Sequence, residues 1–193
     1  MRIRFAISGV ALLALTLPAC TMSSSEANRK EAQSNSPRHA TEEERGKYLT
    51  TIGGCNDCHT PWAPGPDGQP APVKERLLSG HPADMELPPL PEPRGPWIWA
   101  GAASMTAFSG PWGISYATNL TPHDTGMGTW TEEEFIGAMR TGKHRGEGRP
   151  ILPPMPWFSL AEATDEDLKA IWAYLQSIPP IDNRVPAPEP PAD

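Results

Sequence analysis

The sequence has little of what a large hydrophobic core needs. Of its 193 residues 38% are hydrophobic, whereas 25 are proline, and many of these prolines stand in stretches that exclude helix and central strand. A chain of this length has room for one ordinary domain with targeting and linker segments, and the regular core of that domain must be small. We therefore expect a covalently bound group to help stabilise it.

Basic clusters are also missing. The formal net charge is −7, and neither a basic block nor a basic–aromatic stripe occurs, so we expect no nucleic-acid partner. This acidity is typical of a soluble protein, and it leaves open a preference for a basic docking partner.

Long hydrophobic runs are scarce as well. The N-terminal one, residues 5–17, is shorter than the roughly twenty residues that a membrane-spanning helix needs. It follows Arg2 and Arg4, as the core of a signal peptide does. The run ends in Leu17-Pro18-Ala19-Cys20, which resembles the lipobox of bacterial lipoproteins.

We therefore predict a signal peptide over residues 1–19 and a lipid on Cys20, which would hold the mature chain on a membrane outside the cytoplasm. The alternative is an ordinary cleaved signal with an unmodified Cys20. The polar residues 20–40 then form a flexible tether. Because Thr21 rather than an aspartate follows Cys20, the periplasmic face of the outer membrane is slightly favoured.

Cysteine is limited to three residues, and each has a role that needs no disulfide. Beyond Cys20, the other two lie in Cys55-Asn56-Asp57-Cys58-His59, the C-x-x-C-H signature of covalent haem attachment. Two thiols at this spacing in a helical turn reach the two vinyl groups of a porphyrin, and His59 then binds the iron through a ring nitrogen. The sequence therefore predicts one covalent haem c.

Two other kinds of site share part of this motif. A thioredoxin-like redox site needs a βαβ context, and the proline-rich stretch after His59 does not provide one. A structural zinc site needs a second pair of ligands, and the chain has no other cysteine pair.

The sixth ligand of the iron decides between an electron carrier and a gas-binding or peroxidase site. The candidates are Met85, Met105, Met127, Met139, Met155, His81, His123 and His144. We predict Met155, because the prolines of Pro153-Pro154-Met155-Pro156-Trp157 make a stiff, extended loop that presents the thioether at a fixed point. The main alternatives are His144 and His81.

Two of the remaining candidates are assigned to other places. Met139 lies on the apolar face of a predicted helix and is expected in the core. His123 and Met127 lie in a glycine-rich turn that we expect to be exposed.

Three helices begin with an N-cap threonine that is followed three positions later by an acidic residue. They are predicted from Thr41 to about Ile52, from Thr131 to Gly142, and from Thr164 to just before Pro179. Between the first two, residues 61–116 are rich in proline and glycine and hold Trp62, Trp97, Trp99 and Trp112. We expect this insertion to form an ordered loop or a small hairpin that packs on the haem edge.

The motifs together resemble the class I c-type cytochromes, and more narrowly the cytochrome c subunits of bacterial membrane alcohol and aldehyde dehydrogenases. The matching stretches are Gly46-Lys47-Tyr48-Leu49, Cys55 to Trp62, Asn119-Leu120-Thr121-Pro122, Gly128 to Glu133, Pro153 to Trp157, and Thr164 to Leu168 with Ala173-Tyr174-Leu175. The resemblance implies an all-α cytochrome c fold over residues 41–186, with the insertion 61–116 between haem motif and middle helix. Residues 187–193 are expected to be a disordered tail.

The resemblance also implies site residues. Haem would be attached at Cys55 and Cys58, and its iron would be bound by His59 and Met155. The residues expected to line the pocket are Asn119, Leu120, Trp130 and Trp157.

The expected function is electron transfer between redox partners, a donor and an acceptor, by a lipid-anchored monohaem carrier that is not itself an enzyme. One alternative is a haem-bearing subunit of a membrane oxidoreductase complex, although the related subunits usually carry three haem motifs and this chain has one. Another is a haem peroxidase or gas sensor, which would require a labile Met155.

Overall fold

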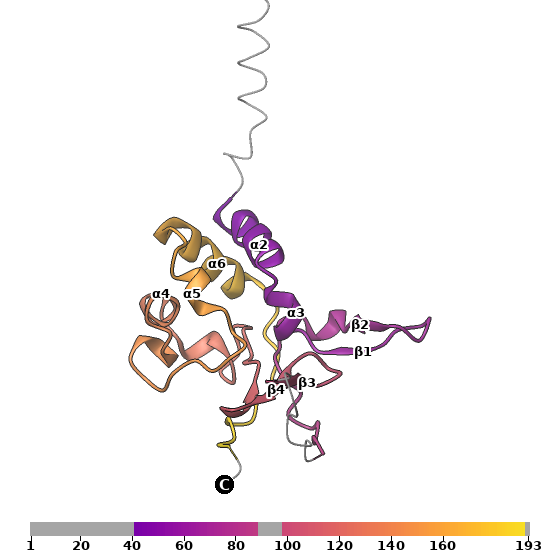
Figure 1. Ribbon diagram of the computed structural model, residues 1–193. Helices are drawn as coiled ribbons and strands as arrows, with labels where there is room; N and C mark the ends of the chain where they lie inside the picture. The colour runs from indigo at the N-terminus through magenta and orange to yellow at the C-terminus, as the bar shows by residue number, and fades with distance from the viewer. Residues whose placement is uncertain (1–40, 89–97, 192–193) are drawn as a thin grey trace, which may run out of the picture. The chain divides into compact units, whose positions relative to one another are not determined.

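A computed structural model describes residues 41–88 and 98–191 (Figure 1). The predicted signal peptide over residues 1–19 and the tether over residues 20–40, with its Cys20, lie outside the described residues. No helix in the described ranges is both long and apolar enough to cross a membrane.

The three predicted helices are confirmed. They are α2 (Glu42–Ile52), α4 (Glu132–Thr141) and α6 (Asp165–Ser177). Each begins after its predicted threonine, whose side chain accepts a hydrogen bond from the amide three residues on. Helix α4 ends, as predicted, at Gly142, which takes the left-handed conformation. Two shorter helices, α3 (Cys55–His59) and α5 (Trp157–Leu160), complete the set.

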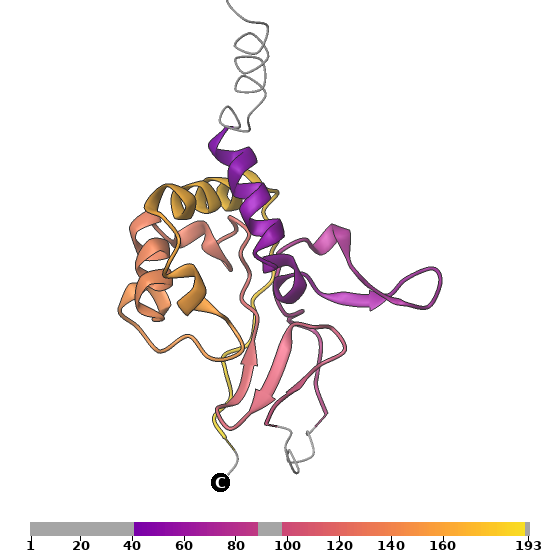
Figure 2. The same cartoon turned by 45° about the horizontal axis from the view of Figure 1, so that its top comes forward.

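Helices α2 and α6 cross in close contact (Figures 1 and 2). The crossing depends on Gly46, because a Cβ atom there would overlap the carbonyl oxygen of Ala170 and meet the Cβ of Tyr174. Arg45 donates a hydrogen bond to Asp167 at 2.7 Å, which joins the same two helices. The first and last helices of the described chain therefore stabilise each other.

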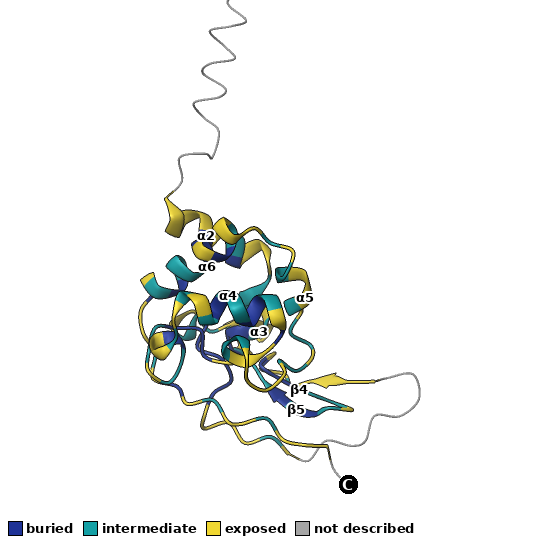
Figure 3. Ribbon diagram, turned by 90° about the vertical axis from the view of Figure 1, so that its left-hand side faces the viewer, coloured by how far each residue is buried: buried dark blue, intermediate teal, exposed yellow. Residues whose placement is uncertain are grey.

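The hydrophobic core lies between α4, α6 and two neighbouring loops, and its positions are dark blue in Figure 3. Its buried members are Leu78, Leu120, Met127, Phe135, Ala138, Met139, Leu168, Ile171, Leu175 and Ile178. The prediction that Met139 belongs to the core is confirmed. The expectation that Met127 is exposed is wrong: 4% of it is exposed, because its glycine-rich turn folds back and Met127 N donates to Thr121 O at 2.8 Å.

The all-α fold class is wrong, because the insertion forms β-structure. Strands β1 (Trp62–Pro64) and β2 (Pro70–Pro72) make one antiparallel sheet, and β3 (Ala100–Gly101), β4 (Ala107–Gly110) and β5 (Gly113–Tyr116) make another. With five helices and two sheets in the described ranges, the fold is mixed α and β. Proline and glycine keep this stretch from forming helix, while antiparallel pairing satisfies its backbone groups.

The sheets are joined to the rest of the chain by long-range contacts. Trp62 N donates to Ser104 O at 3.0 Å, which links β1 to the loop between β3 and β4. On the outer side of β5, Ile114 pairs with Glu189, a residue of the segment predicted as a disordered tail. Tyr116 adds a 2.5 Å hydrogen bond to the carboxylate of the same Glu189.

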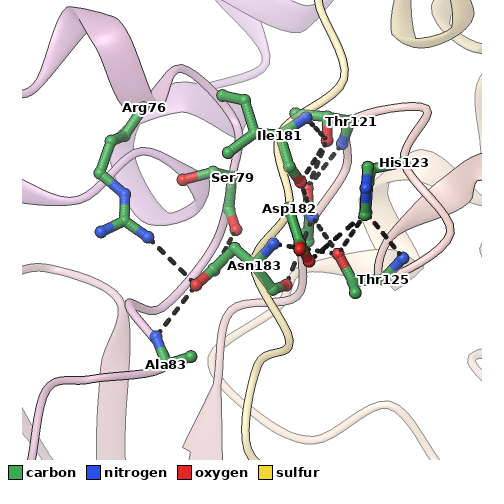
Figure 4. Close-up of polar contacts among 10 residues, drawn as sticks. Arg76, Ser79, Ala83, Thr121, His123, Thr125, Ile181, Asp182 and Asn183 are labelled. Carbon is green, nitrogen blue, oxygen red and sulfur yellow. Dashed lines mark hydrogen bonds and ion pairs between the residues drawn. The ribbon is translucent and has the colours of Figure 1, made fainter.

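Two buried asparagines, Asn119 and Asn183, connect the C-terminal segment to the interior, and Asn183 is labelled in Figure 4. Asn183 Nδ2 donates to the carbonyls of Ser79 and His81, at 2.7 and 2.8 Å. Asn119 Nδ2 donates to the carbonyl of Ile181 at 2.8 Å, and its Oδ1 accepts from the amide of Thr121 at 2.9 Å. The chain around residues 79–81 and 119–121 is therefore fixed by side-chain amides.

Candidate functional site

The C-x-x-C-H motif forms the short helix α3. Gly54 precedes it with a φ of 69°, a left-handed conformation that suits glycine, and the helical turn places Cys55 and Cys58 on one side. Both are free cysteines that are partly buried. Burial raises the pKa of the Cys55 thiol to about 11 and also raises that of Cys58, so both thiols are neutral at pH 7.

His59 stands at the end of α3 with a defined orientation. It is 8% exposed, and its Nδ1 lies 2.8 Å from the carbonyl oxygen of Thr118. Because a carbonyl only accepts, Nδ1 carries the proton and Nε2 keeps the lone pair. Burial lowers the pKa of His59, which keeps the ring neutral, and a neutral imidazole with a free Nε2 is what an iron ion requires.

Thr118 reaches His59 because two chain segments, 78–81 and 117–120, lie side by side. His81 N donates to Ala117 O at 2.9 Å, and Leu120 N donates to Leu78 O at 2.8 Å. Between these two bonds, the amide of Gly80 donates instead to His59 O, at 2.7 Å. Gly80 has a φ of 77°, and a Cβ there would overlap the backbone of residues 117–119, so only glycine allows this approach.

Met155 is partly buried and packs against the hydrophobic core, as do Cys55 and Trp130. Its loop is fixed at two places. Ile151 N donates to Gly142 O at 2.8 Å, and the hydroxyl of Ser115 donates to Pro153 O at 2.6 Å. The structure therefore brings the predicted thioether and the first predicted thiol onto one core.

The two histidines predicted as alternatives to Met155 both make other contacts with their rings. His81 is buried with both ring nitrogens engaged, Nδ1 at 2.9 Å from Thr106 Oγ1 and Nε2 at 3.4 Å from Met85 O. His144 packs edge-on against Trp130, with ring centroids 4.9 Å apart. A ligand role for His81 would require both of its hydrogen bonds to break or rearrange.

The other sixth-ligand candidates occupy varied positions. Met85 and Met105 are each 38% exposed, whereas Met127 and Met139 are core residues. His123 Nδ1 lies 2.9 Å from the hydroxyl of Thr125.

Among the four predicted pocket residues, Leu120 belongs to the core. Trp130 packs against this core, as Cys55 and Met155 do. Trp157 instead lies over Gly142, where a Cβ would overlap its ring. Asn119 uses its amide for the hydrogen bonds to Thr121 and Ile181. Sequence reasoning missed Thr118 and Ser115, and no local signal identifies them, because each acts on a residue far along the chain.

This donor set fits a covalently attached haem. It offers two thiols one helical turn apart, a neutral imidazole with a free nitrogen, and a thioether on the adjoining core. Within residues 41–88 and 98–191, no group of three or more His, Cys, Asp or Glu side chains could hold a metal ion by itself.

Comparison with curated proteins finds several relatives, whereas no family model matches the chain. The fructose dehydrogenase cytochrome subunit of Gluconobacter japonicus is 33% identical over 147 residues, which are 75% of this chain and 23% of that protein. A nicotinate dehydrogenase subunit of Pseudomonas putida is 32% identical over 145 residues, 75% of this chain and 9% of the relative.

The gluconate 2-dehydrogenase cytochrome c subunit of Pantoea cypripedii is 30% identical over 139 residues, which cover 71% of this chain and 23% of that protein. The chain thus spans less than a quarter of the length of each of these relatives.

Proposed function

The chain is related to the cytochrome c subunits of bacterial dehydrogenases, and from that premise we propose that it is a monohaem electron carrier. Cys55 and Cys58 attach one haem through thioether bonds, and His59 and Met155 bind its iron. The chain passes electrons between a donor and an acceptor protein and has no substrate chemistry of its own.

The observation that carries this proposal is the hydrogen bond between His59 Nδ1 and Thr118 O, 2.8 Å long. It fixes the ring orientation and the tautomer, so that Nε2 is the nitrogen available to a metal. A histidine that ligates a metal usually donates its other ring proton in this way, which orients the ring and makes the ligating nitrogen more basic.

Bound haem would supply a one-electron redox couple, and the residues around it would set its reduction potential. Met155 would contribute a thioether, which favours the reduced state, and this side chain packs against the hydrophobic core. Because His59 and Met155 would both bind the iron, small molecules would have no open coordination site. This arrangement suits electron transfer better than peroxidase or gas-binding chemistry.

Substitution of Met155 tests the proposal. Wild-type oxidised protein should show the weak far-red charge-transfer band of a sulfur–iron(III) bond, and Met155→Ala should lose it. The same change should lower the reduction potential and let the iron bind cyanide and carbon monoxide.

His81→Ala and His144→Ala are the matched controls, and both should keep the band and nearly the same potential. If Met155→Ala keeps the wild-type spectrum while a histidine variant becomes high-spin, the ligands are two histidines. A high-spin wild type that binds ligands freely would contradict the carrier function itself.

We also propose that the mature chain is anchored by lipid on Cys20 at the periplasmic side of a bacterial membrane. The support is the Leu17-Pro18-Ala19-Cys20 sequence behind a short apolar run. Cys20→Ser should release haem protein from the membrane fraction or block its processing. An unchanged mass and unchanged membrane association of that variant would contradict lipidation.

The names of the relatives favour a second candidate, a haem-bearing subunit of a dehydrogenase complex. In that case the chain would be the electron acceptor of a catalytic partner rather than a free carrier. Purification of the native protein in mild detergent distinguishes the two, because only a subunit co-purifies with a dehydrogenase at constant stoichiometry.

A further inference from the structure

Strand β5 and the two residues after it form hydrogen bonds to His59 and to the loop that holds Met155, the two proposed iron ligands. Thr118 O accepts from His59 Nδ1 at 2.8 Å, and three residues earlier the Ser115 hydroxyl donates to Pro153 O at 2.6 Å. We propose that Ser115 is a positioning residue, which holds the Met155 loop so that the thioether stays on the iron. This inference rests on the proposed His59 and Met155 ligation.

The geometry assigns the Ser115 proton to Pro153. The hydroxyl has one proton and two carbonyls in reach, Pro153 O at 2.6 Å and Phe108 O at 3.3 Å, and the shorter contact is the stronger. Trp112 Nε1 donates to Ser115 Oγ at 3.3 Å, so the oxygen also accepts a bond. Ser115 is 8% exposed, and water therefore has little access to replace these bonds.

The loop has few other ways to be held. Pro153, Pro154 and Pro156 have no N–H groups, which leaves mainly carbonyls to connect this stretch to its surroundings. In the described part of the chain, the Ser115 bond is the only hydrogen bond that ties residues 152–155 to another element. The neighbouring attachments are Ile151 N to Gly142 O on one side and the Trp157 ring over Gly142 on the other.

Ser115 can act as a support because β5 is itself fixed on both sides. Ser115 pairs with Phe108 of β4, and the preceding Ile114 pairs with Glu189 on the opposite edge. Gly113 has a φ of 91° and lets the backbone of residues 189–191 approach so closely that a Cβ would overlap it. The strand therefore gives the loop a rigid attachment point.

The test compares four variants of the haem-loaded protein: Ser115→Ala, Ser115→Thr, Ser109→Ala and Met155→Ala. Ser109 is the matched control, because it lies on β4 of the same sheet and its hydroxyl makes no hydrogen bond within the described residues. The readouts are the rate of cyanide binding to the oxidised iron and the pH at which the far-red band disappears. Both report dissociation of the methionine.

Loss of one hydrogen bond should raise the population of dissociated Met155, and so the cyanide rate, about five-fold in Ser115→Ala. The far-red band should disappear at lower pH in that variant. Ser115→Thr keeps a hydroxyl and should restore both values, while Ser109→Ala should match the wild type. Far-ultraviolet circular dichroism verifies that each variant is folded.

A wild-type cyanide rate in folded Ser115→Ala would overturn the inference, as would equal acceleration in Ser109→Ala, which would indicate a general loosening of the sheet. A folded Ser115→Thr variant that reacts as fast as Ser115→Ala would overturn it too. Failure of the proposed ligation looks different: Met155→Ala would then have the same spectrum and the same cyanide rate as the wild type, whatever the serine variants do.

Discussion

Asn183 offers a sharp test of how the C-terminal segment stabilises the fold. The residue is 4% exposed, and its amide group makes four hydrogen bonds, of which Figure 4 shows those to Ser79, Ala83 and Arg76. Nδ2 donates to Ser79 O at 2.7 Å and to His81 O at 2.8 Å. Oδ1 accepts from Ala83 N at 3.0 Å and from Arg76 Nη2 at 3.1 Å. Asn183→Ala removes all four at once.

The expected loss follows from this count. Three of the partners are backbone groups that lose their bond to the amide, and each lost bond costs about 1 kcal/mol. The Arg76 guanidinium is partly exposed and can bind water instead, so it adds little. We therefore expect the free energy of unfolding to fall by about 3 kcal/mol, a large share of the stability of a small domain.

Urea denaturation of the haem protein, followed by circular dichroism, measures this loss as a shift of the midpoint at constant slope. Asp182→Ala is the matched control. The Asp182 side chain is next to Asn183 in the sequence and 77% exposed, so its removal should change the stability by less than about 0.5 kcal/mol. A loss of less than about 1 kcal/mol in Asn183→Ala, or one equal to the control's, would refute the reasoning.

Two further predictions concern the alkaline range and the helix crossing. Burial and the hydrogen bond to Glu189 raise the pKa of Tyr116 from 10.0 to about 12, so the folded state resists ionisation and stability should fall as pH rises from 10.0 to about 12. In an ultraviolet titration Glu189→Gln should ionise Tyr116 at lower pH and leave Tyr174 unchanged; an unchanged Tyr116 midpoint would contradict the contact. Gly46→Ala should destabilise the protein by about 1–3 kcal/mol in thermal or urea unfolding, because its methyl group overlaps Ala170 O. Lys47→Ala, exposed on the same helix, is the control, and equal stability of the two variants would contradict the close crossing.

The helices were predictable because their signals are local. Thr41 and Thr131 each form a complete capping box with the glutamate three residues on, and Gly142 ends α4 in the left-handed conformation. The haem motif is equally local, since five consecutive residues both form α3 and carry the two thiols and the imidazole. Such features need only a few neighbouring residues to be recognised.

The strands were not predictable in the same way. They are two to four residues long, which is too short to show the alternation that marks a strand. Their stability comes from pairing with distant residues, such as Ile114 with Glu189. The buried position of Met127 has a similar origin, because the glycine-rich turn closes on Thr121 and Asn119 rather than pointing to solvent.

The same distinction explains which part of the candidate site remained hidden. Residue types predict the ligands, but the atoms that orient them come from one segment, 115–118, that has no chemical signature of its own. Thr118 contributes only a backbone carbonyl to His59, and Ser115 contributes a hydroxyl to a loop 38 residues later in the chain. Because both supports lie on one strand and its extension, a displacement of β5 would act on both proposed axial ligands together. The insertion that makes the fold depart from an all-α protein therefore ends in the segment on which the geometry of the iron would depend.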